Sequence, residues 1–573
     1  MTIFCILTGY CGNLLRAQTG PGGVPGASLW LKADAGINSS SVTYFNVPAA
    51  NRTASSTYND ASLTPAYSTL SSSSAWAASS AVTGQYLTLD LGSVQTVYGV
   101  VTKGRQGSYA QWVKKYTVSY SNDNVNYTPL GITFPGNIDQ NTEATNIFPS
   151  AITARYVRIT ETDYNSHPCM RVDLIKNVNP FSAGDSSVHL WQDQSSSGMN
   201  FMRRGATAPV YQNSGAAGTN FNPVIQFNGS NYFENYVSVP SANNTNYTKF
   251  AVFNTTGTTG NIISAADPGN SAFYLSGGSL YLYHNGNLSN PVPVSNNVPV
   301  IGTGVWSNGT SNGTYIKTNG KSGTAFTSST GYTAGGLQIG AFQSGTNIPA
   351  SSTIAETIVF SSALSPAQIN KVESYLAMKY GVTLDPQNYV AGDGTVIWNS
   401  GTNSGYNNNI AGIGWDYDSG LIQKQSQSVN GGFQPVIGNG NIAATNAGNS
   451  NSFNEDGTFM VWGSDTGSTT FSTAFSYGGL NYRMARTWKV QKTKTIAAVK
   501  IAVPVSLWLG SVTKPSLLVS GTTVFDASSI KPMAKENIGG TDYYTVTVDP
   551  SSVQYFSFAG FVTAPGGVAG TSL

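Results

Sequence analysis

The fold is decided by four stretches of sequence: GQYLTLDLGSV (Gly84–Val94), KGRQGSYAQWVKKYTVSYSNDNVNY (Lys103–Tyr127), ARYVRI (Ala154–Ile159) and HPCMRVDLI (His167–Ile175). The chain around them is dominated by Gly, Ser, Thr and Asn among its polar residues, and only 9% of its residues are charged while 11% are aromatic. Disordered chains usually contain few aromatic residues. Low charge, many aromatics and Gly-rich turns together predict folded β-sandwiches outside the cell.

In order and spacing, these stretches resemble the discoidin domain, also called the coagulation-factor 5/8 C-type domain. Trp76 before them and FPGNIDQNT (Phe134–Thr142) between them belong to the same pattern. The resemblance implies a small β-sandwich whose loops bind sugars, lipid head groups or protein surfaces and which performs no chemistry. The chain departs from the family at Tyr127, where Trp is common, and at Cys169, which lacks the usual partner of a terminal Cys pair.

Length and charge bound the possible partners. At 573 residues the chain is long enough for roughly three to four domains. The net charge is only +2, and no cluster of Lys and Arg supplies the basic stripe that nucleic-acid binding needs. Nucleic acid is therefore excluded as an expected partner.

The first eighteen residues, MTIFCILTGYCGNLLRAQ, place a short apolar run before small residues. We predict a signal peptide over residues 1–18; because no Lys or Arg precedes the apolar run, its start is interpreted as truncated. A buried first strand is the alternative. Cleavage would remove Cys5 and Cys11 and leave Cys169 without a disulfide partner. Elsewhere no apolar run approaches the ~20 residues of a membrane helix, so we expect a soluble, secreted or cell-surface protein without membrane insertion.

A second set of motifs lies on both sides of the discoidin-like stretch in the sequence. WLKADAG (Trp30–Gly36), WQDQSSSG (Trp191–Gly198) and the closing TIAETIVFSSALSPAQINKVESYLAMKYGVTL (Thr353–Leu384) resemble the laminin-G-like, concanavalin A-like jelly roll of secreted bacterial surface proteins. In that family the first two pieces normally follow each other closely. Here about 150 residues separate them, and the discoidin-like stretch fills the gap.

We interpret this arrangement as a domain insertion, because loop tips of a sandwich tolerate inserted modules well. The predicted boundaries are 19–37 and 179–384 for the split jelly roll and 38–178 for the discoidin-like module. The alternative is a tandem array, in which WLKADAG (Trp30–Gly36) belongs to an independent short element.

One convincing helix is expected near the end of the jelly roll. Ser365 is a predicted N-cap, Pro366 stands at the first helical position and Gly381 ends the helix. Its predicted buried stripe consists of Ile369, Val372, Leu376 and Tyr380.

The rest of the chain continues the modular pattern. We predict a further β-sandwich over residues 385–562. Residues 563–573 then read as the start of a next repeat, because PGGVAGTSL (Pro565–Leu573) matches PGGVPGASL (Pro21–Leu29) at seven of nine positions. A coincidental Gly/Pro-rich linker is the alternative.

Nothing in the sequence predicts catalysis. The isolated His189 and His284 lack the spacing partners of a zinc site, and we assign them structural roles. No G-x-S-x-G elbow is present. A glycosidase needs two carboxylates, and Glu356 on the closing strand is a lone acid. The chain is therefore predicted not to be an enzyme.

Binding is predicted at the loops of the discoidin-like module, since loops on a rigid sandwich commonly carry function. Sugar recognition needs aromatic faces beside charged or amide groups. Trp76, Trp112 and Tyr116 are expected in the core instead, and the competing interpretation is that Arg105 and Asp60 only brace the loops. The candidate ligand-binding residues are Tyr58, Asn59, Asp60, Arg105, Gln106, Tyr109 and His167.

No cofactor is required by this scheme. The resemblance to the two families implies a structural calcium ion held by loop oxygens, for which Asp60 and Asp193 are the candidate ligands. The polar loops lack the apolar tips that lipid-binding relatives use, so a membrane ligand is disfavoured.

The expected function is non-catalytic carbohydrate binding and cell adhesion at a bacterial surface. Glycans or glycoproteins, and neighbouring modules of a longer chain, are the expected partners. A structural stalk or filament repeat without a ligand is the first alternative. An accessory part of a larger polysaccharide-degrading enzyme is the second.

Overall fold

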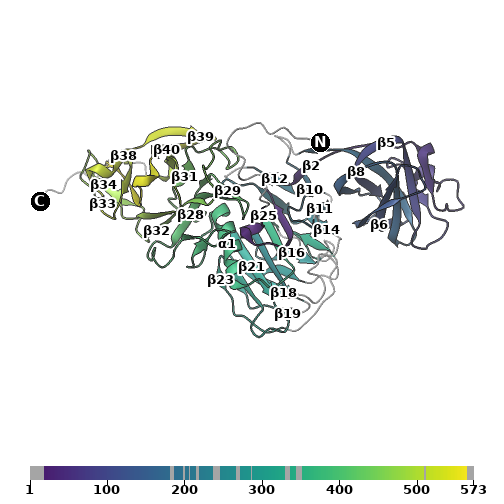
Figure 1. Ribbon diagram of the computed structural model, residues 1–573, viewed down its shortest axis with the longest axis horizontal. Helices are drawn as coiled ribbons and strands as arrows, with labels where there is room; N and C mark the ends of the chain where they lie inside the picture. The colour runs from purple at the N-terminus through teal and green to yellow at the C-terminus, as the bar shows by residue number, and fades with distance from the viewer. Residues whose placement is uncertain are drawn as a thin grey trace, which may run out of the picture.

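The computed structural model describes residues 18–137, 139–180, 186–197, 200–204, 207–213, 219–235, 246–265, 271–284, 287–328, 336–342, 351–508 and 512–563. Within them the chain forms β-strands arranged in sandwiches and a single α-helix, α1 (Pro366–Tyr380) (Figure 1). The predicted all-β, multidomain fold class is confirmed. The predicted leader falls almost entirely on residues 1–17 and the predicted repeat start on 564–573, which lie outside the described residues.

A module of seven strands occupies one end of the molecule, in the purple and blue part of the chain (Figure 1). Long β5 pairs with β3, β8 and β9, and β8 continues past β5 to pair with β6. The strands are β3 (Arg52–Ala54), β4 (Trp76–Ala77), β5 (Tyr86–Lys103), β6 (Trp112–Ser121), β7 (Thr128–Pro135), β8 (Ala144–Asn165) and β9 (Cys169–Pro180).

The module has its own hydrophobic core. Trp76 and Tyr116 are fully buried in it, as the sequence predicts, and they pack with Leu87 and Leu89 of β5. Trp112 is only half-buried, so its assignment to the core is wrong. It is the first residue of β6, where the chain has only just entered the sheet from an exposed loop.

The module is joined to the rest of the molecule by paired strands. β2 (Ile37–Tyr44) enters it and β9 leaves it, and the two run antiparallel, with Tyr44 opposite Ile175. The other end of β2 pairs with β10 (Val188–Trp191), Ile37 lying opposite Trp191. The chain therefore enters and leaves the module side by side, a geometry that disturbs a host domain little.

A central sandwich follows, built from two sheets around one core. β1 precedes the module in the sequence, yet it pairs with β25, with Lys32 opposite Glu356. The first sheet consists of β1 (Ala27–Lys32), β12 (Val210–Gln212), β13 (Val224–Asn228), β15 (Tyr247–Thr255), β21 (Val300–Trp306), β22 (Tyr315–Thr318), β23 (Lys321–Ser322) and β25 (Ser351–Phe360). The second adds β11 (Phe201–Arg204), β14 (Tyr232–Asn235), β16 (Gly260–Ala265), β17 (Ala272–Ser276), β18 (Ser279–His284), β19 (Asn287–Leu288), β20 (Val292–Pro293) and β24 (Leu337–Ile339) to β2 and β10.

His189 and His284, the two histidines of the central sandwich, are held by contacts with neighbouring side chains. His284 is buried and stacks on Trp306, with ring centroids 3.5 Å apart. His189 accepts a hydrogen bond of 2.9 Å from Nε of Arg203, and burial lowers its pKa to about 4. Neither ring belongs to a cluster of three or more metal-ligating side chains within the described residues.

Helix α1 begins and ends as the sequence predicts. Ser365 accepts from the backbone N–H of Gln368, whose side chain accepts from the N–H of Ser365 in return, and Gly381 adopts the left-handed conformation. The predicted stripe of Ile369, Val372, Leu376 and Tyr380 is buried.

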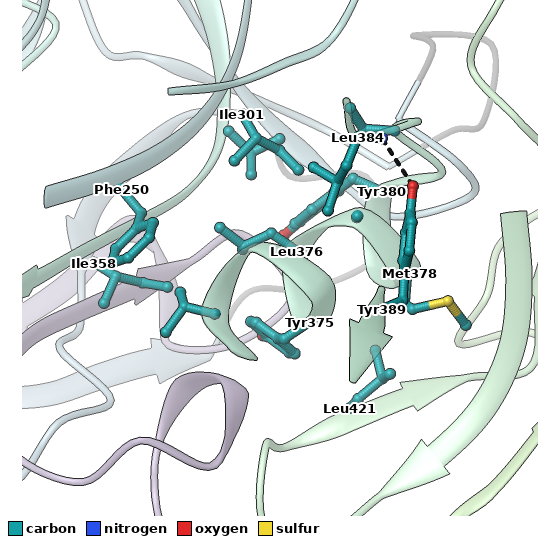
Figure 2. Close-up of a cluster of buried hydrophobic side chains, with 14 of the residues drawn as sticks. Phe250, Ile301, Ile358, Tyr375, Leu376, Met378, Tyr380, Leu384, Tyr389 and Leu421 are labelled. Carbon is teal, nitrogen blue, oxygen red and sulfur yellow. Dashed lines mark hydrogen bonds between the residues drawn. The ribbon is translucent and has the colours of Figure 1, made fainter. Parts of the chain in front are cut away.

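The helix is buried on more than one side. Figure 2 shows it between Phe250 and Ile358 of the central sandwich and Leu421 of the following sandwich. Trp398 and Val461 from beyond the helix belong to the same hydrophobic cluster. The central and C-terminal sandwiches therefore share one core through α1.

The C-terminal sandwich occupies the yellow-green end of the chain (Figure 1). Its larger sheet consists of β28 (Asn408–Asp416), β29 (Leu421–Gln423), β32 (Thr458–Ser464), β33 (Phe471–Ala474), β34 (Tyr482–Met484), β35 (Trp488–Lys492), β37 (Val512–Ser520), β38 (Ile530–Pro532) and β41 (Tyr555–Val562). The smaller sheet consists of β30 (Gln425–Ser426), β31 (Val436–Asn439), β36 (Val499–Pro504), β39 (Ala534–Ile538) and β40 (Thr541–Val548), and β26 (Tyr389–Val390) pairs with β27 (Val396–Trp398). Trp462, Trp488 and Phe558 lie in the core between them.

Candidate ligand-binding face

Several loops of the module meet at one end, near the start of β9. Gln140 donates to the carbonyl of Tyr109 at 2.8 Å, which joins the β7–β8 and β5–β6 loops. Asn165 at the end of β8 donates to the carbonyl of Ala110 at 2.7 Å. We call this surface the loop-end face. It is defined by the seven residues that the sequence predicts for ligand binding: Tyr58, Asn59, Asp60, Arg105, Gln106, Tyr109 and His167.

One part of the loop-end face is built by Arg105 and Tyr109. The guanidinium carbon of Arg105 lies 3.9 Å from the centroid of the Tyr109 ring, and Nη1 donates to Oε1 of Gln111 at 2.8 Å. Tyr109 is nevertheless 55% exposed, more than any other tyrosine in the described part of the chain. The guanidinium of Arg105 thus covers one face of the Tyr109 ring, while the rest of this side chain is open to solvent.

The other part is built by Tyr58 and His167. Their rings meet edge to face with centroids 5.6 Å apart. Nε2 of His167 donates to the carbonyl of Ala78 at 2.9 Å, so the imidazole is held in place by the backbone. Tyr58 is 46% exposed. The Tyr58 ring is therefore a second exposed aromatic group, and it lies next to the His167 imidazole.

Asp60 lies close to Tyr58 in the sequence and is engaged locally. Its Oδ1 accepts from the backbone N–H and the hydroxyl of Ser62, at 2.8 and 2.7 Å. These bonds, helped by the charge of Arg105, hold the pKa of the Asp60 carboxyl below its ordinary value. Asp60 therefore braces its loop, as the competing interpretation predicts.

Gln106 is hydrogen-bonded to Arg171, a residue that the sequence analysis does not single out. Its side-chain oxygen accepts from Nη1 of Arg171 at 3.4 Å. The guanidinium of Arg171 is buried and also donates to the carbonyls of Gly104, Gln140 and Ser72 at 2.7, 2.8 and 3.2 Å. Arg171 is thus a positioning residue that ties three loops together beneath the face. Because arginine is mostly exposed in proteins, the sequence around Arg171 does not predict that this side chain is buried.

The candidate calcium ligands are not brought together. Oδ1 and Oδ2 of Asp193 accept from the backbone N–H of Trp30 and from the hydroxyl of Ser195, at 2.8 and 2.7 Å, which fixes β1 against the turn after β10. Asp60 lies in the module instead. No group of three or more His, Cys, Asp or Glu side chains that could hold a metal occurs in the described part of the chain.

Cys169 is a free, buried cysteine at the base of the loop-end face. Burial raises the pKa of its thiol to about 12. A thiol that stays protonated is a poor nucleophile, so this side chain contributes packing rather than chemistry.

The comparison with known protein families agrees with this architecture for part of the chain. Residues 51–174 match the F5/8 type C domain, and this segment is a discoidin-type domain. Residues 368–551 match a domain of unknown function, DUF8202, and that match begins inside α1.

Two curated relatives each match 18% of this chain. Lactadherin of Sus scrofa is 36% identical over 109 residues, which are 18% of this chain and 27% of lactadherin. A discoidin-1 chain of Dictyostelium discoideum is 32% identical over 108 residues, 18% of this chain and 42% of that protein. The chain thus spans less than half the length of these curated relatives. The solved structure of discoidin II from Dictyostelium discoideum aligns at 17% identity and a TM-score of 0.21, covering 54% of this chain and 92% of its own.

None of the described helices is long and apolar enough to cross a membrane.

Proposed function

We propose that the protein is a non-catalytic, exported adhesin whose discoidin-type module binds glycans through the loop-end face. The observation that carries the proposal is the pair of exposed rings, Tyr58 and Tyr109, each held beside a hydrogen-bonding group. An aromatic face binds the C–H surface of a pyranose, and Arg105 supplies donors for its hydroxyl groups. Nδ1 of the neutral His167 ring, whose Nε2 donates to the Ala78 carbonyl, supplies an acceptor. Loops held from beneath by Arg171 pre-organise the surface, which lowers the entropic cost of binding.

The remaining parts are proposed to display this module. The central sandwich, which we propose to be a laminin-G-like jelly roll split by the module, holds it on paired strands, and the C-terminal sandwich stiffens the carrier through α1. A bacterial surface, and a signal peptide over residues 1–18, complete the proposal. Any bound calcium would be structural.

Removing either half of the Arg105–Tyr109 pair is expected to weaken glycan binding at least tenfold. Both side chains belong to the loop-end face, and Tyr and Arg are enriched among the hot-spot residues whose truncation costs about 2 kcal/mol or more, which exceeds the roughly 1.4 kcal/mol of a tenfold change in affinity. The measurement is a glycan array with the full chain, followed by calorimetric titration of bound sugars with Arg105→Ala and Tyr109→Ala. The array includes galactose and chitosan oligosaccharides, because a family 32 carbohydrate-binding module in complex with galactose and a chitosan-binding module are among the solved structures similar to this chain.

Matched controls replace equivalent side chains elsewhere on the module. Tyr98→Ala removes an exposed tyrosine of β5, and Arg155→Ala removes an arginine paired with Asp90; both are expected to bind as the wild type does. Equal binding by the loop-end variants and the controls would assign the ligand to another surface. A wild-type chain that binds no glycan would favour the structural stalk.

A further inference from the structure

A cavity of about 430 Å³ opens on the flank of the module. Tyr44 at the end of β2, Lys103 at the end of β5 and Glu143 before β8 line one side. The segment Thr69 to Ser71 lines the other. Cavities of about 300–1,000 Å³ are typical of small-molecule sites, so this one is large enough for a ligand.

The lining is suited to a polar ligand with one apolar face. Nζ of Lys103 lies 3.0 Å from Oε1 of Glu143, and the hydroxyl of Tyr44 donates to Oε2 at 3.1 Å. Burial and the neighbouring Glu143 carboxylate raise the pKa of Tyr44, which therefore remains a neutral donor. The Lys103 ammonium and the Glu143 carboxylate can bind sugar hydroxyls, and Tyr44 supplies both a phenol hydroxyl and an aromatic ring for the C–H face of a pyranose.

The wall of this cavity is also the support of the loop-end face. Nη1 of Arg171 donates to the carbonyls of Leu70 and Ser72 at 3.4 and 3.2 Å, and the same atom donates to Gln106 on the loop-end face at 3.4 Å. Lys103 and Arg105 are two residues apart, so their Cα atoms are separated by at most about 7 Å. The cavity and the loop-end face are therefore neighbours along one stretch of the chain.

The lining continues toward the central sandwich. Tyr44 and Glu143 also line a smaller cavity of about 80 Å³, whose far side is formed by His189, Met202 and Arg203 of β10 and β11. Ligand sites occur preferentially where domains meet. The flank cavity is thus placed between the loop-end face and the module's attachment to its host.

We propose that the flank cavity is a second saccharide subsite, so that the ligand is an oligosaccharide rather than a single terminal sugar. The inference rests on the proposed function of the loop-end face and extends it to the length of the ligand. A glycan anchored on Tyr109 and Arg105 passes over the Thr69–Ser72 segment and places a further sugar against Tyr44 and Glu143.

The test fills the cavity without touching the loop-end face. Ser71 is an exposed residue on the cavity wall, and Ser71→Trp places an indole into the space. Ser93→Trp, at an exposed position in the bulged part of β5, is the control for adding a tryptophan to the surface. Both full-length variants are titrated with galactose, glucosamine, and galactan and chitosan oligosaccharides of two to six sugars.

The wild type and Ser93→Trp are expected to bind the longer oligosaccharides at least tenfold more tightly than the single sugar. Ser71→Trp is expected to lose this gain while binding the single sugar normally. Length-dependent affinity that survives in Ser71→Trp, or wild-type affinity that does not rise with length, would overturn the second subsite and leave the loop-end face intact. Binding that persists in Arg105→Ala and Tyr109→Ala would instead overturn the proposed function itself.

Discussion

Replacing Arg52 by methionine is expected to lower the free energy of unfolding of the module by about 3–5 kcal/mol, the usual cost of removing one partner of a buried ion pair. The Arg52 side chain has no exposed surface, and the Asp173 side chain that it contacts at 3.3 Å is 4% exposed. Methionine retains the apolar stem but provides no donor. The carboxylate of Asp173 would be left buried without its counter-ion.

The guanidinium of Arg52 also satisfies oxygens from three separate segments. It donates to the carbonyl of Val47 at 2.9 Å, of Ser68 at 3.0 Å and of Val172 at 2.7 Å. Leaving a buried acceptor without a donor costs about 1–3 kcal/mol. Val47 precedes β3, Ser68 ends the 3-10 helix Pro65–Ser68 and Val172 lies in β9. The loss is therefore expected to loosen the module as a whole rather than one loop.

The expected loss depends on pH with a definite sign. Burial raises the pKa of Asp173 above its ordinary value, and the charge of Arg52 opposes that rise. In Arg52→Met the opposition is gone, so the folded-state pKa rises further above the unfolded one. An acid of this kind stabilises the fold at low pH and loses that contribution as the pH rises through the folded pKa. The deficit relative to wild type should therefore shrink as the pH falls from about 7 toward about 5.

Calorimetric unfolding of the full chain measures this prediction, since the module has its own core and should give its own transition. Arg155→Met is the control, because it breaks an arginine–aspartate pair in the same module that is open to solvent. The control should unfold as the wild type does. An Arg52→Met module that unfolds at the wild-type temperature, or a deficit that grows on acidification, would contradict the argument.

The sequence predicts the local parts of this structure well. Helix α1 begins at Pro366 and ends before Gly381 because capping and glycine conformations are set by neighbouring residues. Exposed tyrosines on polar loops were also predictable, and Tyr58 and Tyr109 are exposed. Their common position at one end of the module followed from the family resemblance rather than from periodicity.

What the sequence does not predict depends on contacts between distant residues. Arg52, in a polar stretch, and Arg171, within a strand, are both expected at the surface from the sequence, yet both are buried because carbonyl groups from several segments converge on them. Trp112 reads as core but is only half-buried at the start of its strand. The flank cavity combines residues from 44 to 173, and no local pattern brings them together.

Replacing Glu356 by alanine is expected to destabilise the central and C-terminal sandwiches together by about 3–5 kcal/mol. Glu356 has no exposed surface, and its two oxygens accept four hydrogen bonds. Oε1 accepts from Nε1 of Trp30 at 2.6 Å and from the Tyr375 hydroxyl at 2.8 Å. Oε2 accepts from Nζ of Lys379 at 2.9 Å and from the Tyr380 hydroxyl at 2.8 Å.

The position of Glu356 explains why two domains should respond to one substitution. Its donors come from β1, which precedes the module, and from α1, which lies in the core shared with Trp398 and Leu421. Alanine would leave the buried Lys379 ammonium with Asp34 as its remaining carboxylate partner, at 3.0 Å, and would remove the acceptor of three other donors. Helix α1 would then be held less firmly against either sandwich.

Calorimetry again separates the outcomes. In Glu356→Ala the transition of the two sandwiches should move to lower temperature as one event, while the transition of the module stays in place. Glu455→Ala is the control, because Glu455 pairs with Lys494 at an exposed site of the C-terminal sandwich. If the central sandwich alone were destabilised and the C-terminal one kept its wild-type transition, the shared core would not couple them. The carrier would then consist of independent domains, and the stiffness proposed for display of the module would have no physical basis.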